Sequence, residues 1–139
     1  PVRRCIGLSH SGWKGTAARM GARTVEAMTE TFGSDPADIR AAIGPSICQD
    51  CYEVSADVIE EFRKAFSKEC WPELYYAKEN GKYQLNLWRA NELIFREAGI
   101  LPEHTAVTDL CTCCNPSLLF SHRASHGKRG NLGAFLMLK

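Results

Sequence analysis

The order of elements predicted from the start of the chain is the feature that most constrains its fold. The first residues alternate loosely between apolar and polar side chains, which predicts a strand at about 3–9, and a turn with two glycines follows. Apolar side chains then recur at near-helical spacing over 16–32, and Gly33 ends this predicted helix. A short strand is predicted at 39–43. The segment between the two strands is long enough for parallel pairing, so a strand-helix-strand unit is expected.

The rest of the chain mixes helices with short, separated strands. Apolar stripes predict one helix that begins near Val54 and another over 85–99, and Asn80-Gly81 indicates a hairpin or tight turn between them. No internal repeat, low-complexity run or linker divides the sequence. We therefore expect residues 1–139 to belong to one domain of the α+β or mixed α/β class. Further short strands are predicted at 105–108, 118–123 and 134–138.

Composition excludes several classes of partner. Lysine and arginine total 17 against 16 acidic residues, and no basic block could neutralise a phosphate backbone, so nucleic acid is not expected. No apolar stretch approaches the roughly 20 residues that cross a bilayer, and the N-terminus lacks the profile of a signal peptide, which predicts a cytoplasmic protein without a membrane partner. Because Pro1 is not an initiator methionine and residues from Val2 onward already have the pattern of a strand, we expect the C-terminal portion of a longer protein.

Histidine and arginine provide the first candidates for chemistry. His10 stands where the predicted opening strand meets the turn before a helix, a position that often carries ligand-binding groups. Histidine is also the commonest metal ligand, although a hydrogen-bonded histidine near the core fits the same spacing. Arg123 and Arg129 bracket a loop with His122 and His126. Their guanidinium groups suit a phosphate or carboxylate, and the alternative is a solvated basic loop.

The seven cysteines form an odd set, and no secretory signal points to an oxidising compartment, so reduced thiols or metal ligands are expected rather than disulfides. Cys48 and Cys51 have the two-residue spacing of a zinc or redox pair. The later cluster, Cys111, Cys113 and Cys114, offers three thiols rather than one clean pair. A four-thiol zinc site is one interpretation, and reduced thiols packed in loops are the favoured one.

Several stretches in this order resemble one known family. They are His10-Ser11-Gly12-Trp13-Lys14-Gly15, then Ile43-Gly44-Pro45-Ser46-Ile47 with Cys51-Tyr52-Glu53-Val54, and finally Asp109-Leu110-Cys111-Thr112 with Phe120-Ser121-His122-Arg123. The chain is similar to the C-terminal part of the purine nucleoside phosphorylase family, once called the laccase-domain or polyphenol oxidase family. The resemblance implies an α+β fold layered as helix, sheet, sheet and helix with mixed sheets, as a fragment of a larger single domain.

The resemblance also implies a function and a site. Family members cleave adenosine, inosine, guanosine or methylthioadenosine with phosphate and deaminate adenosine, so a purine nucleoside and phosphate are the expected small-molecule partners. His10 matches one histidine ligand of the family's zinc and is the expected catalytic and metal residue. Trp13 is expected to stack on substrate or to wedge the turn against the core, Arg123 and Arg129 to hold the anion, and Cys111 to pack.

Alternatives to this interpretation follow from what the sequence lacks. The family's other histidine and cysteine ligands lie in blocks that this sequence does not contain, so a truncated, non-catalytic domain is the second hypothesis. Copper-dependent phenol oxidation, the older label, is the third, but copper chemistry of this kind uses many histidines and the chain has 4. Whether the protein forms a homo-oligomer is left open.

Overall fold

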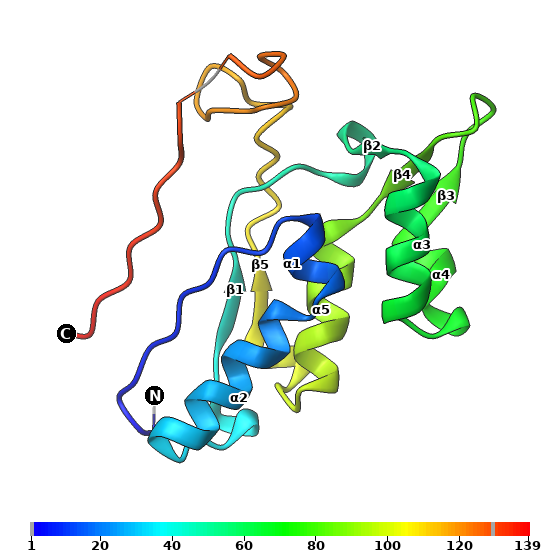
Figure 1. Cartoon of the computed structure of the whole chain (residues 1–139). Helices are drawn as coiled ribbons and strands as arrows, with labels where there is room; N and C mark the ends of the chain where they lie inside the picture. The colour runs from blue at the N-terminus through cyan, green and yellow to red at the C-terminus, as the bar shows by residue number, and fades with distance from the viewer. Residues whose placement is uncertain (1, 129) are drawn as a thin grey trace.

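Two small sheets and the helices around them make up the fold in a computed structural model that describes residues 2–128 and 130–139 (Figure 1). The expected α+β class, with both parallel and antiparallel pairing, is confirmed. The helices are α1 (Trp13–Ala17), α2 (Met20–Phe32), α3 (Ala56–Ala65), α4 (Trp71–Leu74) and α5 (Leu87–Glu97), and the strands are β1 (Ala41–Ile43), β2 (Glu53–Val54), β3 (Tyr75–Ala77), β4 (Tyr83–Leu85) and β5 (Thr105–Val107). Short 3-10 turns are η1 (Pro36–Asp38), η2 (Gln49–Cys51), η3 (Lys68–Cys70) and η4 (Pro102–His104).

The predicted helix over 16–32 is two helices in the structure. The chain turns at Arg19, whose left-handed backbone (φ 58°) separates α1 from α2. This conformation interrupts the helical hydrogen bonds, so the single helix expected from the apolar spacing was wrong at its first turn. Its end was predicted correctly, because Gly33 is left-handed (φ 63°) and its N–H bonds back to the last turn of α2.

The later helices and the hairpin are confirmed. α3 and α5 bury the apolar stripes that the sequence showed, and Asn86 caps α5 by accepting a hydrogen bond from the Arg89 N–H at 2.9 Å. β3 and β4 pair antiparallel on either side of Asn80-Gly81, and Gly81 has a positive φ of 74°. α4 begins at Trp71, directly after the 3-10 turn η3.

The parallel pair differs from the one expected. β1 lies within the predicted strand 39–43, but its parallel neighbour is β5, so the segment 3–9 is not its partner. Among residues 2–128 and 130–139, the segments 3–9, 118–123 and 134–138 belong to no strand. An extended segment becomes a strand only when a neighbour takes up its backbone hydrogen bonds, and none of the described chain does so for these three.

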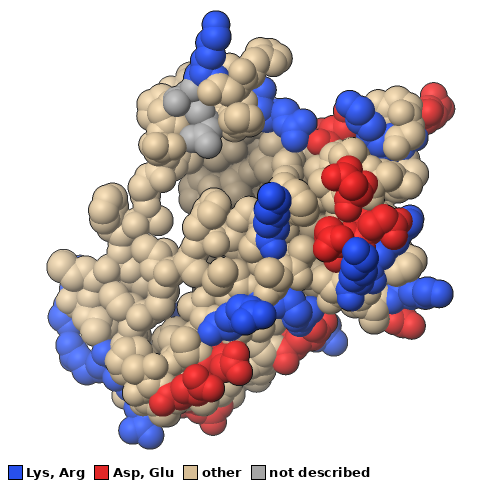
Figure 2. All heavy atoms as spheres, viewed as in Figure 1, with Lys and Arg blue, Asp and Glu red and all other residues tan. Residues whose placement is uncertain are grey.

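The two end segments, residues 3–9 and 134–138, carry large apolar side chains that are exposed. Phe135 is 96% exposed and Met137 is 80% exposed, and Leu8 near the other end is also exposed. Both segments run along one side of the helical body in Figure 1, and in Figure 2 they present mostly uncharged surface. The alternating apolar pattern was therefore not sufficient to predict that these segments form strands.

One main core joins α3, α4 and α5 to the three-stranded sheet β2-β4-β3. Phe62, Leu74, Leu85 and Ile94 are fully buried in it, and a smaller cluster joins α2 to β1 and the end of α5. No helix in the described part of the chain has the length and apolar character needed to span a membrane. Trp13 and Tyr52, which belong to the candidate site described below, pack against this main core.

Candidate functional site

A buried polar network fixes the loop that carries His10 and the start of α1, where Trp13 lies. Thr16, near the end of α1, is fully buried, and its Oγ1 lies 3.0 Å from Ser11 Oγ. The same Oγ1 accepts a hydrogen bond from Asn91 Nδ2 of α5 at 3.2 Å. Because buried hydroxyl and amide groups must be paired, this network ties the loop to α5 in one arrangement.

His10 itself is exposed and lies on irregular chain before α1, not at the end of a strand. It is therefore not the core histidine that the sequence left open. It is also not among the residues that line the pocket next to Trp13. In the described part of the chain, no group of three His, Cys, Asp or Glu ligands includes His10.

Trp13 and Arg123 come together at one pocket. The pocket has a volume of about 300 Å³ and lies where α1, β2 and the start of α3 meet the C-terminal loop. Tyr52, Val58 and Lys82 also line it. The Arg123 guanidinium lies over the Tyr52 ring, 5.5 Å from its centroid. Two of the predicted substrate residues thus share a cavity, whereas Arg129 lies outside the described residues.

The charges at the pocket are partly paired. Glu53 accepts hydrogen bonds from Lys78 and from Asn80, and it forms an ion pair with Lys82 at 3.0 Å. These bonds, led by the one from Lys78, lower the pKa of Glu53 to about 2, so the carboxylate is charged at neutral pH. Burial raises the pKa of Tyr52, and the nearby Arg123 charge opposes that rise. Tyr52 therefore keeps its phenolic proton.

Such a lining suits a planar, partly polar ligand with an anionic group. An indole and a phenol offer aromatic faces, and Arg123 offers a cation with parallel N–H donors. Tyr52 was not among the predicted site residues. The signal for it was its place in the quoted block Cys51-Tyr52-Glu53-Val54, directly after a cysteine of the first pair.

The structure gathers four cysteines beside this pocket. The Sγ atoms of Cys48, Cys51, Cys111 and Cys114 all lie within 4.8 Å of one another, and such a group could hold a metal ion. Burial by itself would raise the pKa of Cys111, but the N–H groups of Cys48 and Cys114 that donate to its Sγ lower it to about 7. Burial and the neighbouring thiols raise the pKa of Cys51.

The sequence interpretation favoured reduced thiols packed in loops, and all seven cysteines are free thiols in the structure, but four of them meet in one cluster. Cys111 is buried, as a packing residue would be, but its sulfur faces three other thiols. The spacing that reveals the cluster was present, because Cys111 and Cys114 repeat the two-residue interval of Cys48 and Cys51. Cys113 between them obscured the repeat.

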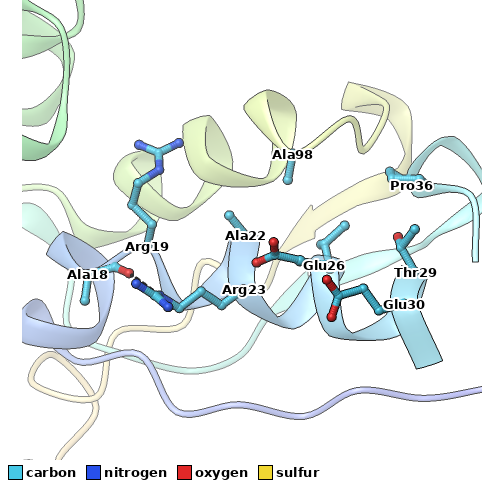
Figure 3. A pocket seen from close by; sticks show the side chains of 10 residues that line it. Ala18, Arg19, Ala22, Arg23, Glu26, Thr29, Glu30, Pro36 and Ala98 are labelled. Carbon is cyan, nitrogen blue, oxygen red and sulfur yellow. Dashed lines mark hydrogen bonds between the residues drawn. The ribbon is translucent and has the colours of Figure 1, made fainter. Parts of the chain in front are cut away.

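A larger hollow lies elsewhere, between α2 and the end of α5 (Figure 3). It has a volume of about 630 Å³, and Arg23, Glu26 and Glu30 project along it from one face of α2. The Arg23 side chain donates to the Ala18 carbonyl at 3.2 Å. Charges of both signs line it and neither His10 nor Trp13 does, so we do not take it as the candidate site.

Comparison with known proteins first defines the class. The fold is that of a solved hypothetical protein YfiH from Bacillus licheniformis, with a TM-score of 0.85 and 40% identity over 92% of this chain and 48% of that one. The chain belongs to the family described as multi-copper polyphenol oxidoreductase laccase, whose model matches residues 1–139. The family resemblance inferred from the sequence motifs is thereby confirmed.

Curated relatives carry two kinds of name. "Purine nucleoside phosphorylase YlmD" of Bacillus subtilis is 40% identical over 139 residues, which are all of this chain and 49% of that protein. "Adenosine deaminase RL5", from an unknown prokaryotic organism, is 35% identical over 118 residues, or 85% of this chain and 44% of that protein. The chain thus spans about half the length of the curated relatives it matches.

Proposed function

We propose that this chain forms part of a purine nucleoside phosphorylase that also deaminates adenosine, acting on adenosine, inosine, guanosine or methylthioadenosine. The observation that carries the proposal is the pocket shared by Trp13, Tyr52 and Arg123. The proposal is supported by one relative that is named a purine nucleoside phosphorylase and by another that is named an adenosine deaminase. A purine nucleoside and phosphate are the partners, and seven cysteines without a disulfide suit a reducing compartment such as the cytoplasm.

Phosphorolysis requires an anion site, stabilisation of a developing ribosyl cation and a proton for the departing purine nitrogen. Arg123 holds the phosphate, since its guanidinium lies over the Tyr52 ring and offers parallel N–H donors to an anion. Trp13 offers an aromatic face to the purine. The Tyr52 hydroxyl retains its proton and can donate a hydrogen bond to the base. Arg129 is a second candidate for the anion.

The zinc that the resemblance implies does not fit this chain's own residues. His10 brings one imidazole, and the described residues gather no second and third ligand around it. We propose that His10 completes a metal site whose other ligands lie in the rest of a longer protein. No step above depends on that metal. Copper, which the family description names, is the less favoured ion, because the chain has 4 histidines.

The test is a phosphate-dependent assay of base release from adenosine and inosine, together with ammonia release from adenosine, on the full-length protein. Arg123→Gln should lower the rate at limiting phosphate, while Lys128→Gln, on the same loop and outside the pocket lining, should not. His10→Ala should lower the metal content of the full-length protein. If phosphate adds no product and the His10 variant behaves like the parent, the truncated, non-catalytic alternative is correct. Phosphate-independent oxidation of a phenol would instead support the older label.

A further inference from the structure

We propose that Cys48, Cys51, Cys111 and Cys114 bind one structural Zn²⁺ ion as a closed tetrathiolate site. This site is separate from the metal expected at His10, which is not part of the group. The proposal does not depend on the proposed function, because it rests on the geometry of the four sulfur atoms and their hydrogen bonds.

The printed distances between the sulfur atoms are close to the edge length of a zinc tetrahedron. A Zn–S bond of about 2.3 Å places tetrahedral sulfur atoms roughly 3.8 Å apart. Cys51 Sγ lies 3.5 Å and Cys48 Sγ lies 3.9 Å from Cys114 Sγ, and all four sulfurs fall within 4.8 Å of one another. A disulfide would bring two sulfurs to about 2.05 Å and would leave the other two thiols without a role.

The ligands come from two short turns with the same internal spacing. Cys48 precedes η2 and Cys51 is its last residue, while Cys111 and Cys114 stand at the two ends of the turn that follows β5. Cys111 Sγ accepts hydrogen bonds from the backbone N–H of Cys114 at 3.4 Å and of Cys48 at 3.3 Å. Backbone N–H groups aimed at a sulfur stabilise its thiolate form, which is the form that binds metal.

The donor set selects zinc and a structural role. The cluster contains four sulfurs and no carboxylate or imidazole, and soft thiolates disfavour Mg²⁺ and Ca²⁺. Four protein ligands fill a tetrahedral ion, so no position is left for water or substrate. On binding, each thiol releases its proton to solvent, and the complex carries a net charge of two minus.

The ion would lie at the junction between the two sheets and add to the hydrogen bonds that hold it. Ser46, after β1, and Cys111, after β5, form a parallel bridge, and the Thr112 N–H donates to the Ser46 carbonyl at 3.0 Å. On the other side, Gln84 of β4 donates to the Asp50 carbonyl in η2 at 2.9 Å. A zinc ion here links the end of the two-stranded sheet to the three-stranded one and fixes Tyr52, the neighbour of Cys51.

The experiment measures metal content and ligand type in the full-length protein. Zinc-loaded parent and Cys113→Ser proteins should contain one more equivalent of zinc than Cys114→Ser, because Cys113 is the adjacent thiol outside the cluster. Replacing the ion with Co²⁺ should give the charge-transfer bands of several thiolates in the parent, in Cys113→Ser and in His10→Ala. Loss of those bands in Cys114→Ser alone is the expected result. Equal bands in Cys114→Ser, or iron in place of zinc, would overturn the proposal.

A second measurement needs no variant, so it holds even if a substitution prevents folding. With Zn²⁺ bound, Cys48, Cys51, Cys111 and Cys114 should resist alkylation by iodoacetamide, while Cys113 should react, and a chelator should make the other four thiols react as well. Equal alkylation of the four with and without Zn²⁺, or a disulfide among them in the reduced, metal-free protein, would refute the site. Loss of phosphorolysis would refute only the proposed function, since neither thiol protection nor the cobalt bands depend on it.

Discussion

The Arg123 guanidinium lies over the Tyr52 ring, with its central carbon 5.5 Å from the ring centroid. Tyr52 follows the first cysteine pair, and Arg123 lies on the loop that follows the second. The contact therefore joins the two chain segments that follow the cysteine pairs. It places a planar cation at the pocket that Trp13 also lines. The proposed role of Arg123 in binding phosphate can therefore be tested with a variant that keeps the positive charge.

Arg123→Lys should raise the KM for phosphate roughly tenfold, equivalent to about 1.4 kcal/mol of binding free energy. Lysine keeps the positive charge but loses the two parallel N–H donors and the flat surface that rests on Tyr52. Steady-state kinetics at varied phosphate would measure the effect. The KM for nucleoside should stay close to that of the parent, and a change in the nucleoside KM alone would contradict the assignment.

Trp13→Leu should raise the KM for nucleoside by roughly tenfold, because stacking of a base on an aromatic ring contributes about 1–3 kcal/mol. Trp13→Phe keeps an aromatic face and should lose much less. The comparison separates a substrate contact from a ring that only wedges the turn. If both variants lose stability equally in thermal unfolding and neither changes the KM, the wedging role is correct.

Glu53 should make the free energy of unfolding of the protein depend on pH. Its pKa is lowered from 4.5 to about 2 by Lys78, Lys82 and Asn80. A lowered pKa means that the contribution to folding is fully present above pH 4.5 and is lost as the pH falls through about 2. Urea unfolding of the parent should therefore show a falling free energy of unfolding across this window. Glu53→Gln should show a smaller fall, and identical pH profiles would disprove the role of this carboxylate.

Asn91→Ala should lower the free energy of unfolding by about 1–3 kcal/mol, because it removes the donor to buried Thr16 Oγ1 and to the Leu87 carbonyl. Asn91→Asp, which has nearly the same shape, should lose more, since it buries an acceptor or a charge against those two oxygens. Thr16→Ser keeps the hydroxyl and is the matched mild change. Denaturant unfolding of the three variants measures the order, and an Asp variant as stable as the parent would contradict it.

Much of the local structure could be predicted from the sequence. The apolar stripes of α3 and α5, the left-handed Gly33 and the turn at Asn80-Gly81 all depend on residues close to one another along the chain. Helical hydrogen bonds and turn conformations close within a few residues, so spacing and residue type are sufficient to predict them. The break at Arg19 was missed because no proline or capping residue marks it.

The sequence by itself therefore determined α3, α5, the end of α2, the hairpin and the residue types on which the proposed chemistry rests, His10, Trp13 and Arg123 among them. Only the tertiary structure decided that β1 pairs with β5, that Trp13 and Arg123 line one pocket, and that four cysteines from two turns meet. Strand pairing and side-chain clusters depend on which distant segments bury surface against each other. No spacing within one segment contains that information.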